Sequence, residues 1–374
     1  MASAAQKRIK SISYAKYGYM FILPFFLVYF FFQLWPLINT FIVAFQGNGS
    51  ETGEAVGLDN FKHLLQKVSL TQEENRKVLG IIPAESEDEI AALTAKKMQG
   101  TIHDDFVTAF KNTLILWFGN FIPQILLSLS LAVWFTDAKL KIPGKGFFKV
   151  VMYMPNIITA ASVAVLFMSL CSESKYGAVN QLLHSMGIVK ELEGPDRDVV
   201  KFVSGVWPAR CVIMFIQTWM WFGNTMIMLM SGIMGINPSL FEAASIDGAS
   251  SGQVFRKITL PLLSPIMVYT LVTSMIGGLQ MFDIPFLYHD GTVVNKDVST
   301  VAVFIYRHFH TGQKYQNYGY SGAASVLLFI VTLALGSITF YMNRDVDAIA
   351  KKKQRKELQK QMKLQNKQFG GLSL

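Results

Sequence analysis

The sequence predicts an all-α polytopic membrane protein with six transmembrane helices, and its composition, apolar runs and charge distribution all support this. Apolar residues make up 51% of the 374 residues and charged residues only 16%, whereas a soluble domain carries about 25% charged residues. The apolar runs are long enough to cross a bilayer, which takes roughly 20 mostly apolar residues in a helix. The turn-rich breaks between the runs exclude a barrel, so helices must satisfy the backbone within the membrane.

Six apolar runs define the organisation of the chain. They cover residues 18–45, 108–136, 147–170, 208–235, 262–288 and 322–342. The first is too long for the core of a signal peptide and no cleavage site follows, so a retained helix is expected after the segment 1–17. Two further segments complete the division, an outer loop at 46–107 and a tail at 344–374 that is expected to fray or be disordered. The other five runs and their connections form a core over 108–343.

The charges between the runs predict the orientation. Basic residues dominate the N-terminal segment, the connection 137–149 and the tail, whereas the loop 46–107 is rich in acids. Because basic residues stay on the cytoplasmic side, both termini are expected inside. The net charge of +9 therefore indicates membrane topology and contact with lipid, and nucleic-acid binding is not expected. Cys171 and Cys211 lack metal-ligand spacing, and two unpaired thiols are favoured over a bridge.

The connection 237–261 reads as a helix-turn-helix on the inner face. Asn237 is expected to cap the N-terminus of the first helix. Pro238 then occupies the first helical position, where the missing N–H of proline costs nothing. The first helix is expected to end near Ile246, because Asp247-Gly248 is a turn signal. Ser250 or Ser251 then caps a second helix, which is expected to end before Pro261.

The same connection resembles the EAA loop of binding-protein-dependent ABC importer permeases. The matching residues are Glu242-Ala243-Ala244, Asp247-Gly248-Ala249, Phe255, Ile258 and Leu260-Pro261. The resemblance implies a type I ABC importer permease-like fold. It also implies that the loop docks on a cytoplasmic ATPase dimer through Glu242, Ala243, Ala244, Asp247, Gly248, Ala249 and Gly252. Glu242 is expected to form an ionic contact there, although a solvated first-turn carboxylate is the simpler alternative.

Further matches favour the carbohydrate branch of that family, similar to maltose and glycerol-phosphate permeases. They are Gly57-Leu58-Asp59-Asn60-Phe61, Asn112-Thr113, Tyr176-Gly177 with Asn180 and Leu183, Phe282-Asp283, Tyr306 and Gly319-Tyr320. Two departures stand out: residues 67–104 form an insertion, and His289-Asp290-Gly291-Thr292 replaces a Gly-Gly-Pro. The insertion is expected to be helical, either as a cap that contacts a receptor or as a decoration on the chain's own outer surface.

The resemblance implies that the chain is a non-enzymatic permease of a bacterial cytoplasmic membrane. It would translocate a sugar or oligosaccharide by alternating access, with a second permease subunit and an extracytoplasmic solute-binding protein. The chain has no phosphate-binding loop of its own. ATP and magnesium are therefore expected on the partner ATPase, with no cofactor or metal site in this chain.

Polar residues inside the spans are the candidates for the solute path, because they are costly there. The candidates are Gln217, Asn224, Gln280 and Asp283, joined by Trp221 and Phe282 as aromatic surfaces for a sugar ring, with Trp219 as a further possibility. Aromatic residues also serve ordinary packing and interfacial belts. An ion-coupled secondary transporter is a competing hypothesis, but it usually needs paired membrane carboxylates and broken repeats. Two more hypotheses compete with a sugar permease, namely an ABC permease for a non-sugar solute and a membrane assembly factor.

Overall fold

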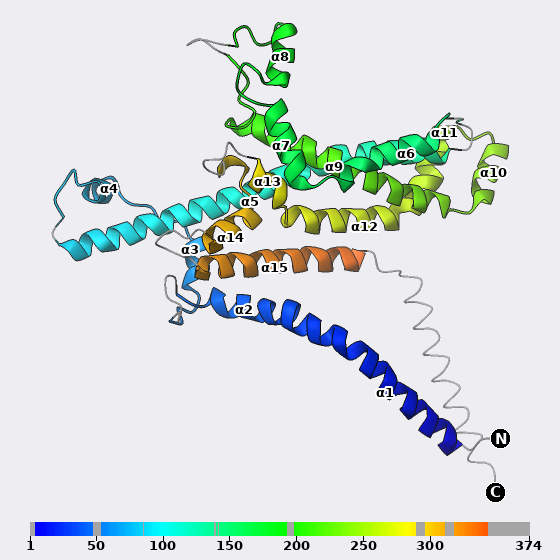
Figure 1. Cartoon of the computed structure of the whole chain (residues 1–374), viewed down its shortest axis with the longest axis horizontal. Coiled ribbons are helices and arrows are strands. Elements are labelled where there is room, and N and C mark those ends of the chain that lie inside the picture. The colour runs from blue at the N-terminus through cyan, green and yellow to red at the C-terminus, as the bar shows by residue number, and fades with distance from the viewer. Residues whose placement is uncertain are drawn as a thin grey trace.

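A computed structural model describes residues 4–47, 54–84, 86–137, 140, 142–192, 198–288, 296–310 and 318–342. The tail predicted at 344–374 lies outside these residues. The described chain is helical, with a single isolated β-bridge between Gln46 and Ala55. Figure 1 shows most of its long helices running side by side.

The helices follow in this order: α1 Ala4–Tyr29, a π-helical turn Phe30–Leu34, α2 Trp35–Ala44, α3 Asp59–Leu65, α4 Gln72–Val78, α5 Glu87–Thr136, α6 Lys145–Tyr153, a 3-10 turn Met154–Ile157, α7 Ala160–Leu170, α8 Ala178–Ser185, α9 Val206–Met234, α10 Pro238–Ile246, α11 Ser251–Val254, a π-helical turn Phe255–Thr259, α12 Leu260–Leu279, α13 Asp283–Leu287, a 3-10 turn Lys296–Val298, α14 Val301–His310 and α15 Tyr318–Met342.

The predicted set of six spans is confirmed. Five helical stretches are long and apolar enough to cross a membrane, and the bent pair α6–α7 makes a sixth if it counts as one span. The beginning of α1, the connection that carries α10 and the end of α15 lie at one end of the bundle (Figure 1). This arrangement agrees with an even number of crossings between the two termini.

Three expected helices differ from those observed. The span expected at 147–170 is bent by 94° between Ile157 and Ala160, where Pro155 lies in a 3-10 turn and Thr159 caps the next helix. The span expected at 262–288 breaks between Leu279 and Asp283. The helix that carries the second span begins well before 108, because α5 is one helix of 50 residues from Glu87 onward.

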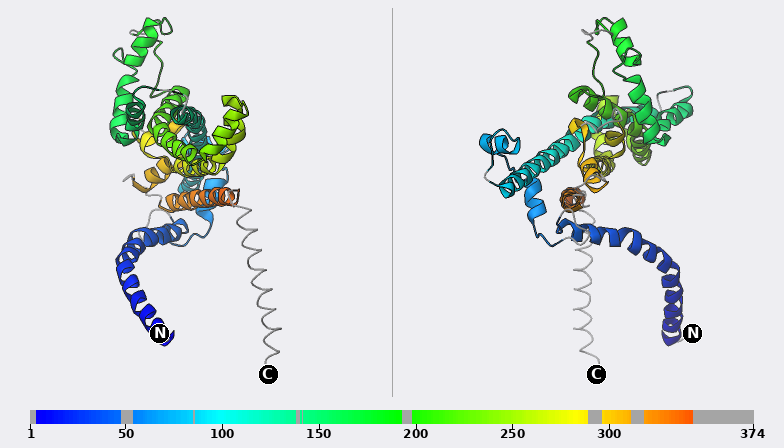
Figure 2. Two further views of the ribbon diagram at one scale, coloured as in Figure 1. Left: turned by 90° about the vertical axis from the view of Figure 1, so that its right-hand side faces the viewer. Right: turned by 60° about the vertical axis from the view of Figure 1, so that its left-hand side comes forward.

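That long helix carries the insertion. The short helix expected at 85–98 is instead the first part of α5, capped by Ser86, whose Oγ accepts from the N–H of Glu89 at 3.2 Å. α4 packs on the same part of α5, at the end that projects furthest from the bundle (Figures 1 and 2). The insertion is helical, as expected from the sequence.

Packing is unequal across the bundle. α5 and α9 share the most extensive interface, and α12 packs on α5, α9 and α15. α2 packs on α15, where Gly322 allows close approach: a Cβ there would lie 2.7 Å from the backbone nitrogen of Ala44. The apolar window of the first span contains no buried residue, and Figure 2 shows α1 bending away from the other helices.

Two asparagines of the sequence matches hold loops in place. The Asn60 Nδ2 donates to the carbonyls of Ala44 at 2.9 Å and Gln46 at 2.8 Å, so it closes the C-terminal end of the first span. The Asn180 amide bonds both the N–H and the carbonyl of Val200, at 2.9 and 3.1 Å. Both side chains are buried, which gives these matches a structural role.

Candidate solute path and coupling loop

A cavity of about 340 Å³ lies between α5, α9, α12 and the start of α13. Its lining comprises Trp117, Asn120, Gln124, Ala160, Gln217, Met220, Trp221, Asn224, Thr225, Met228, Thr270, Thr273, Ser274, Gly277, Gly278, Gln280, Met281, Phe282, Asp283 and Ile284. Amides, hydroxyls and aromatic rings therefore share one concave surface. A concave surface on which polar groups converge beside apolar and aromatic side chains is a candidate small-molecule site.

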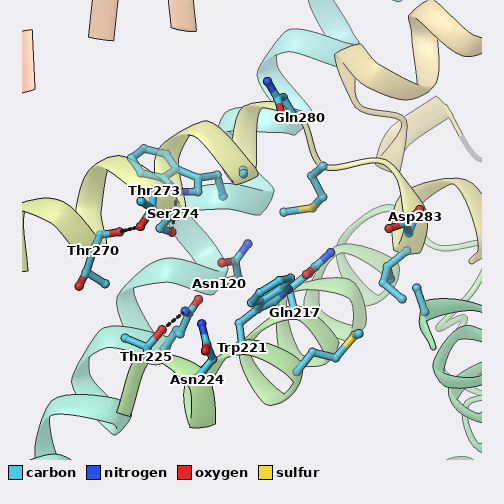
Figure 3. A pocket seen from close by; sticks show the side chains of 18 of the residues that line it. Asn120, Gln217, Trp221, Asn224, Thr225, Thr270, Thr273, Ser274, Gln280 and Asp283 are labelled. Atoms are coloured by element: carbon cyan, nitrogen blue, oxygen red, sulfur yellow. Dashed lines mark hydrogen bonds between the residues drawn. The ribbon is translucent and has the colours of Figure 1, made fainter. Parts of the chain in front are cut away.

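All six residues proposed for the solute path line this cavity: Gln217, Trp221, Asn224, Gln280, Phe282 and Asp283. Figure 3 shows Gln217, Trp221 and Asn224 of α9 facing the polar residues of α5 and α12. Trp219, the further possibility, packs instead against Phe167 with ring centroids 5.7 Å apart. It belongs to the hydrophobic core around α7 and α9.

The cavity also contains polar residues that the sequence analysis did not select. Asn120 and Gln124 lie one turn apart on α5, and α12 contributes Thr270, Thr273 and Ser274. The spacing of three or four residues places each set on one helix face. The rule that polar residues inside spans are candidates would have found Asn120 and Gln124. The hydroxyls carry a weaker signal, because they can bond the backbone of their own helix, as Thr270 does to Ile266 at 2.8 Å.

Two hydrogen bonds between helices hold parts of the polar wall. The Gln124 Nε2 donates to the Thr225 hydroxyl at 2.8 Å, and the Trp117 indole donates to the Ser274 hydroxyl at 3.3 Å. Gln217 differs, because its side chain makes no hydrogen bond to the described chain although only 8% of it is exposed. No fully buried polar side-chain atom among the described residues lacks a partner. The amide of Gln217 therefore opens onto the cavity.

The break between α12 and α13 forms one wall of the cavity. Gln280, Met281 and Phe282 are not helical there. The Thr300 hydroxyl donates to the free carbonyl of Met281 at 2.6 Å, so the chain before α14 satisfies part of the backbone that the break exposes. Non-helical backbone at membrane depth is tolerated where it is buried in protein or lines a cavity.

Aromatic rings continue the wall beyond the break. Phe282 stacks on Phe286 with centroids 4.8 Å apart, and Tyr306 of α14 contacts both rings at 5.1 and 4.9 Å. Phe282 and Tyr306 are among the residues that match the carbohydrate branch in the sequence. The three rings form an aromatic cluster at the end of the cavity that Asp283 also lines.

The segment before α14 is held by α5 and α9. The Arg210 guanidinium donates to the Asn112 Oδ1 at 2.7 Å and to the carbonyl of Asp297 at 2.9 Å. The Asn112 Nδ2 in turn donates to the carbonyls of Lys296 and Ser299. Asn112, a residue of the sequence matches, thus anchors residues 296–300. This segment, which we call the strap, supports the wall formed by the break between α12 and α13.

The loop between α9 and α12 has the helix-turn-helix structure that the sequence predicts. The Asn237 Oδ1 accepts from the N–H of Ser239 at 3.1 Å, and α10 ends at Ile246. Gly248 follows with a φ of +70°. Ser250 is the cap of α11, and it exchanges two bonds with Gln253 in a capping box. One expectation is wrong: the second helix does not end before Pro261 but continues through a π-helical turn into α12. The wider turn accommodates the proline.

The turn after α10, α11 and the π-helical turn that follows line a groove of about 270 Å³, formed by Asp247, Gly248, Ala249, Gln253, Val254, Lys257 and Ile258. Glu242, Ala243 and Gly252 are exposed, whereas Ala244 is buried. The loop also exposes 86% of Ile246, a residue that the sequence analysis did not select. The sequence feature that could have identified Ile246 is an apolar side chain directly before the Asp247-Gly248 turn.

The insertion is held by ion pairs at the opposite end of the molecule. The Lys96 Nζ of α5 lies 2.8 Å from a carboxylate oxygen of Glu74 in α4, and Lys77 pairs with Glu89 at 2.7 Å. The hydrogen bond from Lys96 holds the pKa of Glu74 below its usual value. The two free cysteines and the described acids and histidines form no group of three that could hold a metal ion.

Comparisons with known proteins agree with this arrangement. Residues 124–348 match the family model of the binding-protein-dependent transport system inner membrane component. The chain is 25% identical over 344 residues to the arabinooligosaccharides transport system permease protein AraP of Bacillus subtilis, covering 91% of this chain and 94% of that protein. It is 29% identical over 240 residues to the lactose transport system permease protein LacF of Rhizobium radiobacter, covering 64% of this chain and 76% of that protein.

Among solved structures, a bacterial ABC transporter involved in the import of the acidic polysaccharide alginate has a similar chain, with a TM-score of 0.66 and 23% identity over 91% of this chain and 99% of that one. The matched family model and the shared fold together assign this multi-pass membrane protein to a family. The chain belongs to the family of binding-protein-dependent transport system inner membrane components, the permease subunits of ABC importers.

Proposed function

We propose that this chain forms part of the translocation path for a sugar or oligosaccharide delivered by a solute-binding protein. The observation that carries the proposal is the cavity at the break between α12 and α13, where amides, hydroxyls and aromatic rings meet. Sugars present hydroxyl groups and apolar ring faces, and this lining complements both. Relatives named for lactose and arabinooligosaccharide transport support the same solute class.

The loop from Glu242 to Gly252 is proposed as the element that docks on a cytoplasmic ATPase dimer. Its exposed Glu242 has no partner in the described chain, and Ile246 offers an apolar contact that nothing in the described chain covers. The adjacent groove is open. On this proposal ATP and magnesium bind the ATPase, and closure of the ATPases biases the helices between two states. The end of the bundle that carries α10 then faces the cytoplasm, together with both termini.

A second permease subunit is proposed to complete the path, with the remaining wall of the cavity contributed by that subunit. The insertion around α4 is proposed as a contact for the solute-binding protein, because it projects from the opposite end to the coupling loop (Figure 1). One relative has been solved in complex with an alginate pentasaccharide-bound periplasmic protein. Its similarity to this chain concerns the fold, so the role of the insertion needs its own test.

Filling the cavity tests the proposed function. A Cβ at Gly277 or at Gly336 meets nothing within 4 Å, but only Gly277 lines the cavity. Gly277→Leu should abolish sugar uptake by the reconstituted transporter while leaving its assembly intact. The matched control Gly336→Leu should retain uptake. Normal uptake by a fully assembled Gly277→Leu transporter would place the solute path elsewhere.

A further inference from the structure

The cavity carries one ionisable side chain, and that side chain is an acid. Among the lining residues that the structure describes, Asp283 is the sole acid, and none is Lys, Arg or His. All other polar groups there are amides, hydroxyls and indoles. The cavity of this chain therefore offers hydrogen bonds in both directions but no positive charge for an anionic solute.

Among the residues that the structure describes, none neutralises the Asp283 carboxylate. It is exposed at the start of α13, and no described residue forms an ion pair or a side-chain hydrogen bond with it. Two cations near the strap that supports this wall are already engaged. Arg210 bonds Asn112 and the carbonyl of Asp297, and Lys296 pairs with Asp105 at 3.0 Å. The charge of Asp283 is thus directed at whatever occupies that end of the cavity (Figure 3).

We propose that Asp283 acts as a charge filter in the solute path, so that this transporter carries uncharged sugars and disfavours those built from uronic acids. The inference rests on the proposed function. A carboxylate of the solute would meet a fixed negative charge at that end of the cavity, and like charges repel each other. An uncharged sugar meets no such repulsion, and its apolar ring face can stack on Phe282, which Phe286 and Tyr306 hold in place.

The comparison with the alginate importer makes this inference specific. That solved transporter imports an acidic polysaccharide and has a similar fold. A chain of this fold therefore serves an acidic cargo in that transporter, so the fold alone does not decide the charge of the cargo. Asp283 is the residue of this chain whose charge opposes such a cargo.

Direct binding to the whole transporter tests the filter without the selectivity of the receptor. The complete assembled transporter in lipid nanodiscs would be titrated calorimetrically with neutral trisaccharides of glucose, galactose, arabinose and xylose, and with the trisaccharides of glucuronic and galacturonic acid. Wild type should bind a neutral probe about tenfold or more tightly than its uronic counterpart at low salt. Asp283→Asn should narrow this ratio toward one, and Asp283→Lys should invert it. High salt should narrow the wild-type ratio, because it screens the charge.

The control removes the same charge far from the cavity. Asp88→Asn, in the exposed first turn of α5, should leave the ratio of dissociation constants unchanged. If both Asp283→Asn and Asp283→Lys keep the wild-type ratio of dissociation constants for uronic and neutral probes, the charge filter is overturned and the proposed function stands. Tight binding of uronic probes to wild type would also overturn the filter. Failure of wild type to bind any of the trisaccharides would instead overturn the proposed sugar path on which the filter rests.

Discussion

The coupling loop and the cavity are built in opposite ways. In the loop, each stabilising bond joins residues at most five positions apart. Asn237 caps α10 by accepting from the N–H of Ser239, and Ser250 exchanges two bonds with Gln253 at the start of α11. Gly248 forms the turn between these two helices. In the cavity, the side-chain bonds that join one helix to another link residues about a hundred or more positions apart, such as Gln124 with Thr225 and Trp117 with Ser274. A local motif at one end and a long-range assembly at the other can therefore be disturbed separately.

The largest expected effect lies in the loop, at Gly248. Proline fixes φ near −65°, so Gly248→Pro cannot adopt the observed φ of +70°. Sugar uptake should fall by about 5- to 150-fold, the range of typical coupling free energies, while binding of solute to the cavity persists. Gly187→Pro is the matched control, because Gly187 lies outside the loop and also has a positive φ, of +74°, and open space around it. Equal losses in both variants would mean that the turn is not the coupling element.

The second prediction disturbs the cavity wall through Gly278. A Cβ at this position would lie 2.1 Å from the Trp117 Cδ1, so Gly278→Ala must displace the indole from the cavity wall. Overpacking of this kind costs about 1–3 kcal/mol. We expect a lower melting temperature and weaker solute binding, with ATPase chains still recovered in purification. Gly336→Ala, where a methyl group meets nothing, should change neither measurement.

The third prediction concerns the strap. Asn112→Ala removes the acceptor of Arg210 and the donor to two carbonyls, all in a buried position. Loss of a buried hydrogen-bond partner costs about 1–3 kcal/mol. The melting temperature of the purified transporter should fall, whereas Lys111→Ala at the exposed neighbouring position should leave it unchanged. An unaltered melting temperature in Asn112→Ala would show that the strap is held by other contacts.

The fourth prediction separates recognition from stability at Gln217. Its amide has no side-chain hydrogen bond within the described protein, so Gln217→Leu should leave the melting temperature nearly unchanged. The dissociation constant for a bound sugar should rise about 2- to 12-fold, the effect of one lost hydrogen bond. Calorimetric titration measures this rise. A large loss of stability with unchanged binding would assign Gln217 to packing and not to the solute path.

The smallest expected effect is at the insertion and depends on pH. The bond from Lys96 holds the pKa of Glu74 below its usual value, so its contribution is present at neutral pH and is lost as the pH falls through that lowered pKa. The protection factors of the α4 amides in hydrogen exchange should fall in acid. Glu74→Gln should show the lower protection factors already at neutral pH, and Glu73→Gln, an exposed neighbour in the same first turn, should not. Protection of α4 that is independent of pH in wild type would contradict this explanation.

The regions of the molecule differ in how much of their structure can be predicted from the sequence. The loop could be predicted from Asn237 to the cap at Ser250, because caps, a glycine turn and a proline at the first helical position act over a few neighbours. The six path residues could also be selected, because a polar side chain inside an apolar span is conspicuous. Trp219 was a misleading candidate, since an aromatic residue of a span looks the same whether it lines a cavity or packs in a core.

By itself, the sequence determined the number of spans, the helical class and the structure of the coupling loop. These follow from the length of apolar runs and from local hydrogen bonding, which the chain carries within short segments. Only the tertiary structure decided that α5 continues through the insertion, that the chain breaks at Gln280–Phe282, and that Asn120, Trp221 and Asp283 line one cavity. The break depends on the Thr300 hydroxyl reaching the Met281 carbonyl. The cavity depends on how three helices rotate against one another, and neither property exists until the helices have packed.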